Sequence, residues 1–192
     1  MSNRNGRMST KTLVLGAILT ALVFILQYMG AFVRLGMFSV SLVLIPIVIG
    51  TATCGAGIGA WLGLVFGVAV LVSGDAAPFY AVNPLGTIIT VLLKGIACGG
   101  ISGIVYQLIA KKNRVGGVIA SAIACPVVNS GIFLIGCFIF FMDTIIGWAG
   151  SQELGYYIIF GLGLVNFPVE LAINLILSPV IVRLIEIRNK QK

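Results

Sequence analysis

The sequence is most informative in the residues and motifs that it lacks. It has no histidine and only five acidic residues, and charged residues make up 9% of the chain, against roughly a quarter in soluble domains. No P-loop, His-Glu-x-x-His or Gly-x-Ser-x-Gly motif occurs, and the four cysteines form no Cys-x-x-Cys pair. The sequence therefore predicts no enzyme and no metal or cofactor site, and the cysteines are interpreted as small packing residues.

Apolar residues take the place of the missing charge. They make up 59% of the 192 residues, and the mean hydropathy is +1.16. Because a membrane-spanning helix needs about 20 such residues, we predict an all-α bundle of six transmembrane helices. The expected spans are 12–32, 38–53, 55–72, 84–110, 115–141 and 156–187, with a tight turn over 53–55. A single integral membrane domain, 1–192, then consists of a basic amino terminus, 1–11, the bundle, 12–187, and a tail, 188–192.

The basic residues predict how this bundle lies in the membrane. Six helices return the chain to the side on which it began, so both termini share a compartment. Ten of the twelve basic residues fall on that side: Arg4, Arg7, Lys11, Lys111, Lys112, Arg114, Arg183, Arg188, Lys190 and Lys192. By the positive-inside rule that side is cytoplasmic. The net charge of +7 is then a topology signal, and no nucleic-acid partner is expected.

Two ionisable residues fall well inside predicted spans, where charge is costly and usually marks function. Lys94 lies about 15 Å along the fourth span, at 1.5 Å per residue. Glu170 lies near the middle of the sixth span. Two interpretations stay open: the two side chains pair with each other, or they line a cavity and meet a polar ligand.

Polar residues recur at helical spacing in two spans: Thr87, Thr90 and Lys94 in the fourth, and Asn166, Glu170 and Asn174 in the sixth. Two such faces favour a cavity between the helices. Asn129 is expected to add a third wall, and Pro168 is expected to kink the sixth helix and open space there. The alternative is that these side chains only hold the helices together.

The segment between the third and fourth spans reads SGDAAPFYAVNP. Its Phe79, Tyr80 and Asn83 are expected to cover a site that opens outward, with rings for stacking and an amide for orientation. An interfacial aromatic anchor is the alternative. Arg34, in the first outer loop, is a candidate partner for an anionic ligand group.

Small residues recur every four positions in two further spans: Gly55, Gly59, Gly63 and Gly67 in the third, and Ala17 and Ala21 in the first. Faces of small residues let helices approach closely. The glycine series is either internal packing or a docking surface for another membrane subunit.

Four segments carry a family resemblance: TLVLGAILTAL, with an Ala-x-x-x-Ala motif at Ala17 and Ala21, FSVSLVLIPIVIG, GAGIGAWLGLVFG and NPLGTIITVLLKGIACGGISGIVY. They make the chain similar to the substrate-binding S component of energy-coupling factor (ECF) vitamin transporters. The resemblance implies a monomeric subunit of a bacterial plasma membrane that captures a water-soluble vitamin in an outward pocket. It also implies docking through Ala17 and Ala21 onto a transmembrane coupling subunit that works with two ATP-binding-cassette ATPases.

The chain looks similar to the pantothenate branch of that family, with riboflavin and folate as the next candidate vitamins. In that branch Arg34 or Lys94 would meet a carboxylate. The predicted substrate-binding residues are Arg34, Phe79, Tyr80, Asn83, Thr87, Thr90, Lys94, Asn129, Asn166 and Glu170. A stand-alone facilitator or channel for a small solute is the alternative function.

Overall fold

A computed structural model describes residues 10–30, 34–35, 38–39, 41–162 and 166–190 of the chain. Within these ranges, the side chains of residues 34, 35, 38, 39, 161, 166 and 184–190 are outside the description. The elements in chain order are α1 (Thr10–Gly30), β1 (Arg34–Leu35), β2 (Phe38–Ser39), α2 (Leu44–Cys54), α3 (Ala56–Val72), α4 (Ala77–Val82), α5 (Pro84–Ala110), α6 (Arg114–Phe140), α7 (Met142–Ala149), α8 (Leu154–Tyr156), the π-helix η1 (Tyr157–Gly161) and α9 (Asn166–Lys190).

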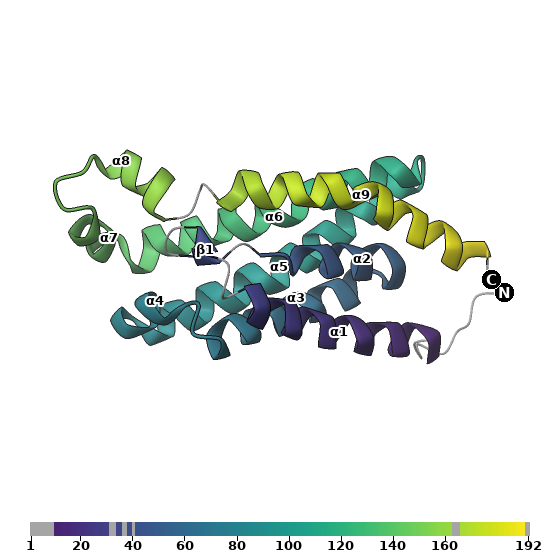
Figure 1. Ribbon diagram of the computed structural model, residues 1–192, viewed down its shortest axis with the longest axis horizontal. Coiled ribbons are helices and arrows are strands. Elements are labelled where there is room, and N and C mark those ends of the chain that lie inside the picture. Colours follow the sequence, from purple (N-terminus) through teal and green to yellow (C-terminus); the bar gives the residue numbers. More distant parts are fainter. Residues whose placement is uncertain (1–9, 31–33, 36–37, 40, 163–165, 191–192) are drawn as a thin grey trace.

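The long helices run alongside one another in an elongated bundle (Figure 1). α1 begins and α9 ends at one end of it, whereas β1, α4, α7 and α8 lie at the other end, called here the loop end. The two strands pair antiparallel over two residues each. Apart from this small hairpin, the regular structure of the described residues is helical, which agrees with the predicted all-α class.

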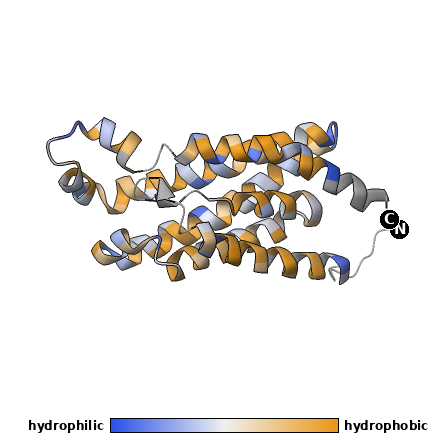
Figure 2. Cartoon of the chain, in the orientation of Figure 1, coloured by the Kyte–Doolittle hydropathy of each residue, from blue (hydrophilic) through white to orange (hydrophobic). Residues whose placement is uncertain are grey.

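The surface of the bundle is apolar. Among the described residues, α1, α5 and α6 are long and apolar enough to cross a membrane, and α2 and α3 are apolar but shorter. Hydrophobic residues cover the outer faces of these helices as well as the inner ones (Figure 2), and only 28% of the most apolar part of α1 is buried. Because such faces are solvated well only by lipid, the fold is that of a membrane-embedded helical bundle.

The predicted turn between the second and third spans lies at Gly55. α2 ends at Cys54 and α3 begins at Ala56, with Gly55 between them at φ +96° and ψ 170°. Side chains other than hydrogen rarely tolerate that backbone conformation, so glycine allows the chain to reverse within one residue. This reversal is why two predicted spans almost touch in the sequence.

The glycines of the third predicted span pack inside the bundle. Gly59 and Gly63 of α3 face Gly99 and Gly95 of α5, and this four-residue contact is called here the glycine seam. A Cβ added to Gly63 would overlap the carbonyl oxygen of Gly95, and one added to Gly99 would overlap that of Gly59. Of the two interpretations of the glycine series, internal packing therefore accounts for these positions, since small residues bring the two backbones together.

The last long helix differs from the predicted sixth span. α9 begins at Asn166, whereas residues 154–161 form the separate α8 and η1. Glu170 thus lies in the second turn of α9 and not at mid-span. Pro168 falls in the first turn of α9, and residues 163–165 before this helix lie outside the described part of the chain. The kink expected at Pro168 therefore stays a prediction. The proline in the interior of this helix is Pro179.

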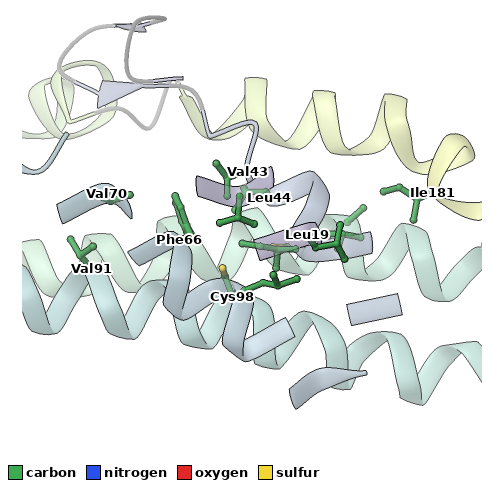
Figure 3. Packing of buried hydrophobic residues seen from close by; sticks show 14 of the residues in the cluster. Leu19, Val43, Leu44, Phe66, Val70, Val91, Cys98 and Ile181 are labelled. Carbon is green, nitrogen blue, oxygen red and sulfur yellow. The ribbon is translucent and has the colours of Figure 1, made fainter. Parts of the chain in front are cut away.

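The main core lies where the long helices meet. Its buried members include Leu19 of α1, Leu44 of α2, Phe66 of α3, Cys98 of α5 and Ile181 of α9 (Figure 3). Cys98, Cys125 and Cys137 are buried in hydrophobic clusters, where they occupy packing positions as the sequence predicted, and Cys54 is partly buried.

Candidate functional site

A cavity of about 70 Å³ opens among the helices toward the loop end. One water needs about 10–15 Å³ on the same measure, so this space holds several. Its walls come from α3, the turn before α4, α4 itself, the first three turns of α5, the second half of α6 and the start of α9. The lining residues that concern the chemistry are Ser41, Phe66, Asp75, Phe79, Thr87, Thr90, Lys94, Asn129, Phe133 and Glu170.

Lys94 and Glu170 face the same cavity without closing on each other. No ion pair of 4.0 Å or less joins them in the described part of the chain. The Lys94 ammonium instead lies 5.5 Å from the ring centre of Phe66 and 5.3 Å from that of Phe133. The faces of aromatic rings attract a cation at these distances, but they do not neutralise its charge. Of the two interpretations of this pair, the cavity is the one that the structure favours.

Glu170 is held by groups from two other elements. It is 4% exposed, and its Oε1 atom accepts a hydrogen bond of 3.0 Å from the backbone N–H of Ser41, just before α2. Its carboxyl group also interacts with the hydroxyl of Ser41, the charge of Lys94 and the side-chain amide of Asn129. Since a carboxylate can accept about four hydrogen bonds, acceptor capacity is left for a molecule in the cavity.

Thr90 and Asn129 each place on the cavity wall a buried polar atom that has no hydrogen-bond partner within the described residues. The atoms are the hydroxyl oxygen of Thr90, on a side chain 4% exposed, and the amide oxygen of Asn129, on a side chain 5% exposed. Leaving such a group unpaired costs about 1–3 kcal/mol. Thr87 differs, because its hydroxyl donates to the carbonyl oxygen of Asn83 at 2.8 Å. Thr90 and Asn129 are therefore the polar groups that a ligand would satisfy.

Aromatic rings close the cavity toward the loop end. Phe79, which is 3% exposed, packs edge-on against Phe133, Phe141 and Trp148 with ring centres 5.7, 4.9 and 5.3 Å away. Such T-shaped contacts are favourable. Because Phe79 packs edge-on against these rings and not parallel to them, the cluster forms an apolar wall of the cavity.

The structure brings six of the ten sequence-predicted site residues to this cavity: Phe79, Thr87, Thr90, Lys94, Asn129 and Glu170. Tyr80 and Asn83 are not on its wall. Tyr80 is 47% exposed, and Asn83 caps α5 through its side-chain oxygen, which accepts from the Gly86 N–H at 3.0 Å. The expected lid is thus a short helix, α4, that buries Phe79 and turns Tyr80 outward. The side chains of Arg34 and Asn166 are outside the description.

Sequence reasoning missed several lining residues, of which Ser41, Asp75, Phe66 and Phe133 matter most. Phe133 follows Asn129 by four residues on α6, a spacing that places both on one helix face and was a usable signal. Asp75 belongs to the SGDAAPFYAVNP segment, of which the sequence analysis singled out other residues. It meets the buried Gln27 of α1, whose amide nitrogen lies 3.5 Å from an Asp75 oxygen. No local pattern indicates Ser41, because it reaches Glu170 across 129 residues.

The Ala-x-x-x-Ala positions lie away from the cavity. Ala17 and Ala21 are exposed on α1. Beside them, the Thr20 hydroxyl donates to the carbonyl oxygen of Gly16 at 2.8 Å and accepts from the indole N–H of Trp61, on α3, at 3.2 Å. A face of small side chains bordered by the half-exposed Trp61 is therefore open to another membrane helix.

The family model described as "ECF transporter, substrate-specific component" matches residues 11–182 of the chain. No curated protein and no solved structure matches it. The match covers every long helix from α1 to most of α9 and confirms the family to which the sequence is similar.

Proposed function

Since the chain belongs to the family of substrate-specific components of ECF transporters, we propose that it captures a water-soluble vitamin in the cavity between α3, α5, α6 and α9. The observation that carries this proposal is that Lys94 and Glu170 line the same cavity and form no ion pair with each other. Charges inside a membrane protein are costly and conspicuous, and here they face open space. The proposed substrate-binding residues are Phe79, Thr87, Thr90, Lys94, Asn129 and Glu170.

We propose pantothenate as the first candidate vitamin. Its carboxylate suits Lys94, and its hydroxyl and amide groups suit Thr90, Asn129 and Glu170. Riboflavin and folate follow. Riboflavin ranks lower because Phe79 packs edge-on against Phe133 and Phe141, an arrangement that differs from two parallel rings holding a flat ring system. Arg34 and Asn166 stay predictions for the same site.

The proposed setting is a bacterial plasma membrane, with six spans and both termini in the cytoplasm. The sequence contains no P-loop motif with which the chain could hydrolyse ATP itself. The proposed partners are therefore the coupling subunit of an ECF transporter and two ATP-binding-cassette ATPases, with Ala17 and Ala21 as the docking contact.

The proposed function is tested by titrating the purified chain in lipid nanodiscs with a panel of vitamins, using calorimetry. We expect nanomolar affinity for one member. Absence of binding across the panel would contradict the proposal. Transport of a vitamin by the chain alone, in liposomes without any ATPase, would favour the facilitator instead.

The docking contact is tested by Ala17→Trp. A bulky side chain on that face is expected to abolish vitamin uptake in cells that contain the whole transporter, because it prevents close helix approach. Vitamin affinity of the purified variant should be unchanged. Leu22→Trp, on another exposed part of α1, is the matched control and should support normal uptake. Equal uptake by both variants would place the docking surface elsewhere.

A further inference from the structure

The charges around the cavity are unequal. Three of the charged side chains that the structure describes line it, the cation Lys94 and the acids Asp75 and Glu170. We infer that the cavity selects a ligand that brings one anionic group to Lys94 and a hydrogen-bond donor to Glu170, and that Glu170 excludes ligands with a second anionic group. This selectivity rests on the proposed function and adds the chemical class of the ligand to it.

Lys94 has no ion-pair partner among the described residues. Its ammonium group has two aromatic rings within 5.5 Å and no ion pair with Glu170. Asp75 already interacts with Gln27. A ligand carboxylate placed over Lys94 makes a charge-assisted hydrogen bond, which is about twice as strong as a neutral one.

Glu170 can take one further donor. Ser41 supplies its backbone N–H to the Oε1 atom and its hydroxyl to the carboxyl group, and the Asn129 side-chain amide is a third donor. A carboxylate accepts about four hydrogen bonds, so a ligand hydroxyl, amide N–H or ammonium fills the acceptor position that is left. A ligand carboxylate has no hydrogen to donate and is repelled, because like charges brought together in a desolvated site cost several kcal/mol.

The cavity wall also carries neutral polar atoms that have no hydrogen-bond partner among the described residues. The Thr90 hydroxyl can donate or accept, and the Asn129 amide oxygen accepts. They suit the uncharged part of a ligand whose charged group binds Lys94 and whose donor binds Glu170. The expected class is thus a monocarboxylate with hydroxyl, amide or ammonium donors. Neutral riboflavin lacks the anionic group, and folate carries two carboxylates.

The test ranks ligands by charge with the full chain in nanodiscs at neutral pH. The probes are pantothenate, biotin, riboflavin, thiamine and folate, together with pantothenol, in which an alcohol replaces the carboxylate of pantothenate. The strongest binder is expected to be a monocarboxylate. If it is pantothenate, pantothenol should bind at least about tenfold more weakly, since a hydrogen bond to a charged group is lost.

The residue that makes the selection is tested by Glu170→Gln. The variant is expected to bind the preferred monocarboxylate about tenfold more weakly and to bind folate more tightly than the parent does. Glu153→Gln makes the same chemical change at an exposed position and should match the parent for every probe. Circular dichroism and thermal unfolding of both variants check that each is folded.

The outcomes separate the two proposals. No binding by any vitamin overturns the proposed function, and the ligand class with it. Tight binding led by riboflavin, thiamine or folate overturns the ligand class alone and leaves a vitamin-binding subunit. A folded Glu170→Gln variant with the parental ranking and affinities overturns the role of Glu170.

Discussion

The two halves of α5 meet the rest of the bundle in opposite ways. From Gly95 onward, α5 lies in backbone contact with α3 along the glycine seam. Before Gly95, the same helix borders a cavity of about 70 Å³ with Thr90 and Lys94. Glycine has no side chain to hold the two helices apart. Thr90 and Lys94, in contrast, present polar groups to a cavity that suits a polar ligand. One helix therefore carries both a rigid contact and a wall of the site.

This comparison explains how the site is positioned. Lys94 immediately precedes Gly95 in the sequence, so the glycine seam fixes the height of Lys94 relative to Phe66, three residues after Gly63 on α3. A close-packed seam cannot slide without collisions. The half of α5 before Gly95, called here the open half, can then hold Lys94 at a constant distance from Glu170 although no direct contact joins the two side chains.

The largest expected effect comes from adding a methyl group to the glycine seam. Gly63→Ala places a Cβ on the Gly95 carbonyl oxygen, so α3 and α5 must move apart. We expect a loss of roughly 3 kcal/mol in the free energy of unfolding, the upper part of the range for overpacking. Thermal unfolding in detergent measures it as a lowered Tm.

Gly57→Ala is the matched control for that variant. Gly57 is an exposed glycine of the same helix, and an added Cβ would meet no atom within 4 Å. Alanine should stabilise the helix there by about 0.5–1 kcal/mol. Equal Tm values for the two variants would show that the seam does not hold α3 against α5.

The next largest effect comes from removing the charge that the open half of α5 presents to the cavity. Lys94→Met keeps most of the length of the side chain and removes its charge, so the bundle should stay folded while vitamin affinity falls about tenfold to a hundredfold, the value of a lost hydrogen bond to a charged group. Calorimetry on the purified chain measures the affinity. Lys111→Met, at an exposed position, should bind as the parent does, and parental affinity in both variants would remove Lys94 from the site.

A smaller effect tests whether the Thr90 hydroxyl, also in the open half of α5, binds the ligand. Thr90→Val replaces a buried hydroxyl that has no partner with a methyl group of similar shape. Stability of the empty protein should rise or stay the same, and affinity should fall about fivefold, because a hydrogen bond to the ligand is lost. A drop in Tm with unchanged affinity would instead make Thr90 a structural residue.

The smallest effect compares two helix caps. Asn83 caps α5 beside the cavity and Asn113 caps α6 at the other end, each accepting from an N–H three residues on, at 3.0 and 3.1 Å. Replacing either with alanine should cost about 1 kcal/mol of stability and leave vitamin affinity unchanged. Weaker binding in Asn83→Ala alone would return Asn83 to the substrate site.

The fold was predictable where one helix carries the signal by itself. The start of α5 at Pro84 and the turn at Gly55 follow from local residue types, and Thr87, Thr90 and Lys94 share a helix face by spacing alone. The boundary of α9 was mispredicted because residues 154–161 are as apolar as a span, yet form short separate helices. Hydropathy measures the preference for lipid and does not register where a helix breaks.

The sequence by itself determined the class of this protein, because scarce charge, long apolar runs and clustered basic residues are properties of composition and order. It also determined which helix faces are polar and which are made of small residues. Only the tertiary structure decided that the glycines close α3 onto α5, that Glu170 meets Ser41, and that Lys94 faces Glu170 across open space. Those relations join residues far apart in the chain, so they depend on packing between helices, which local sequence patterns do not encode.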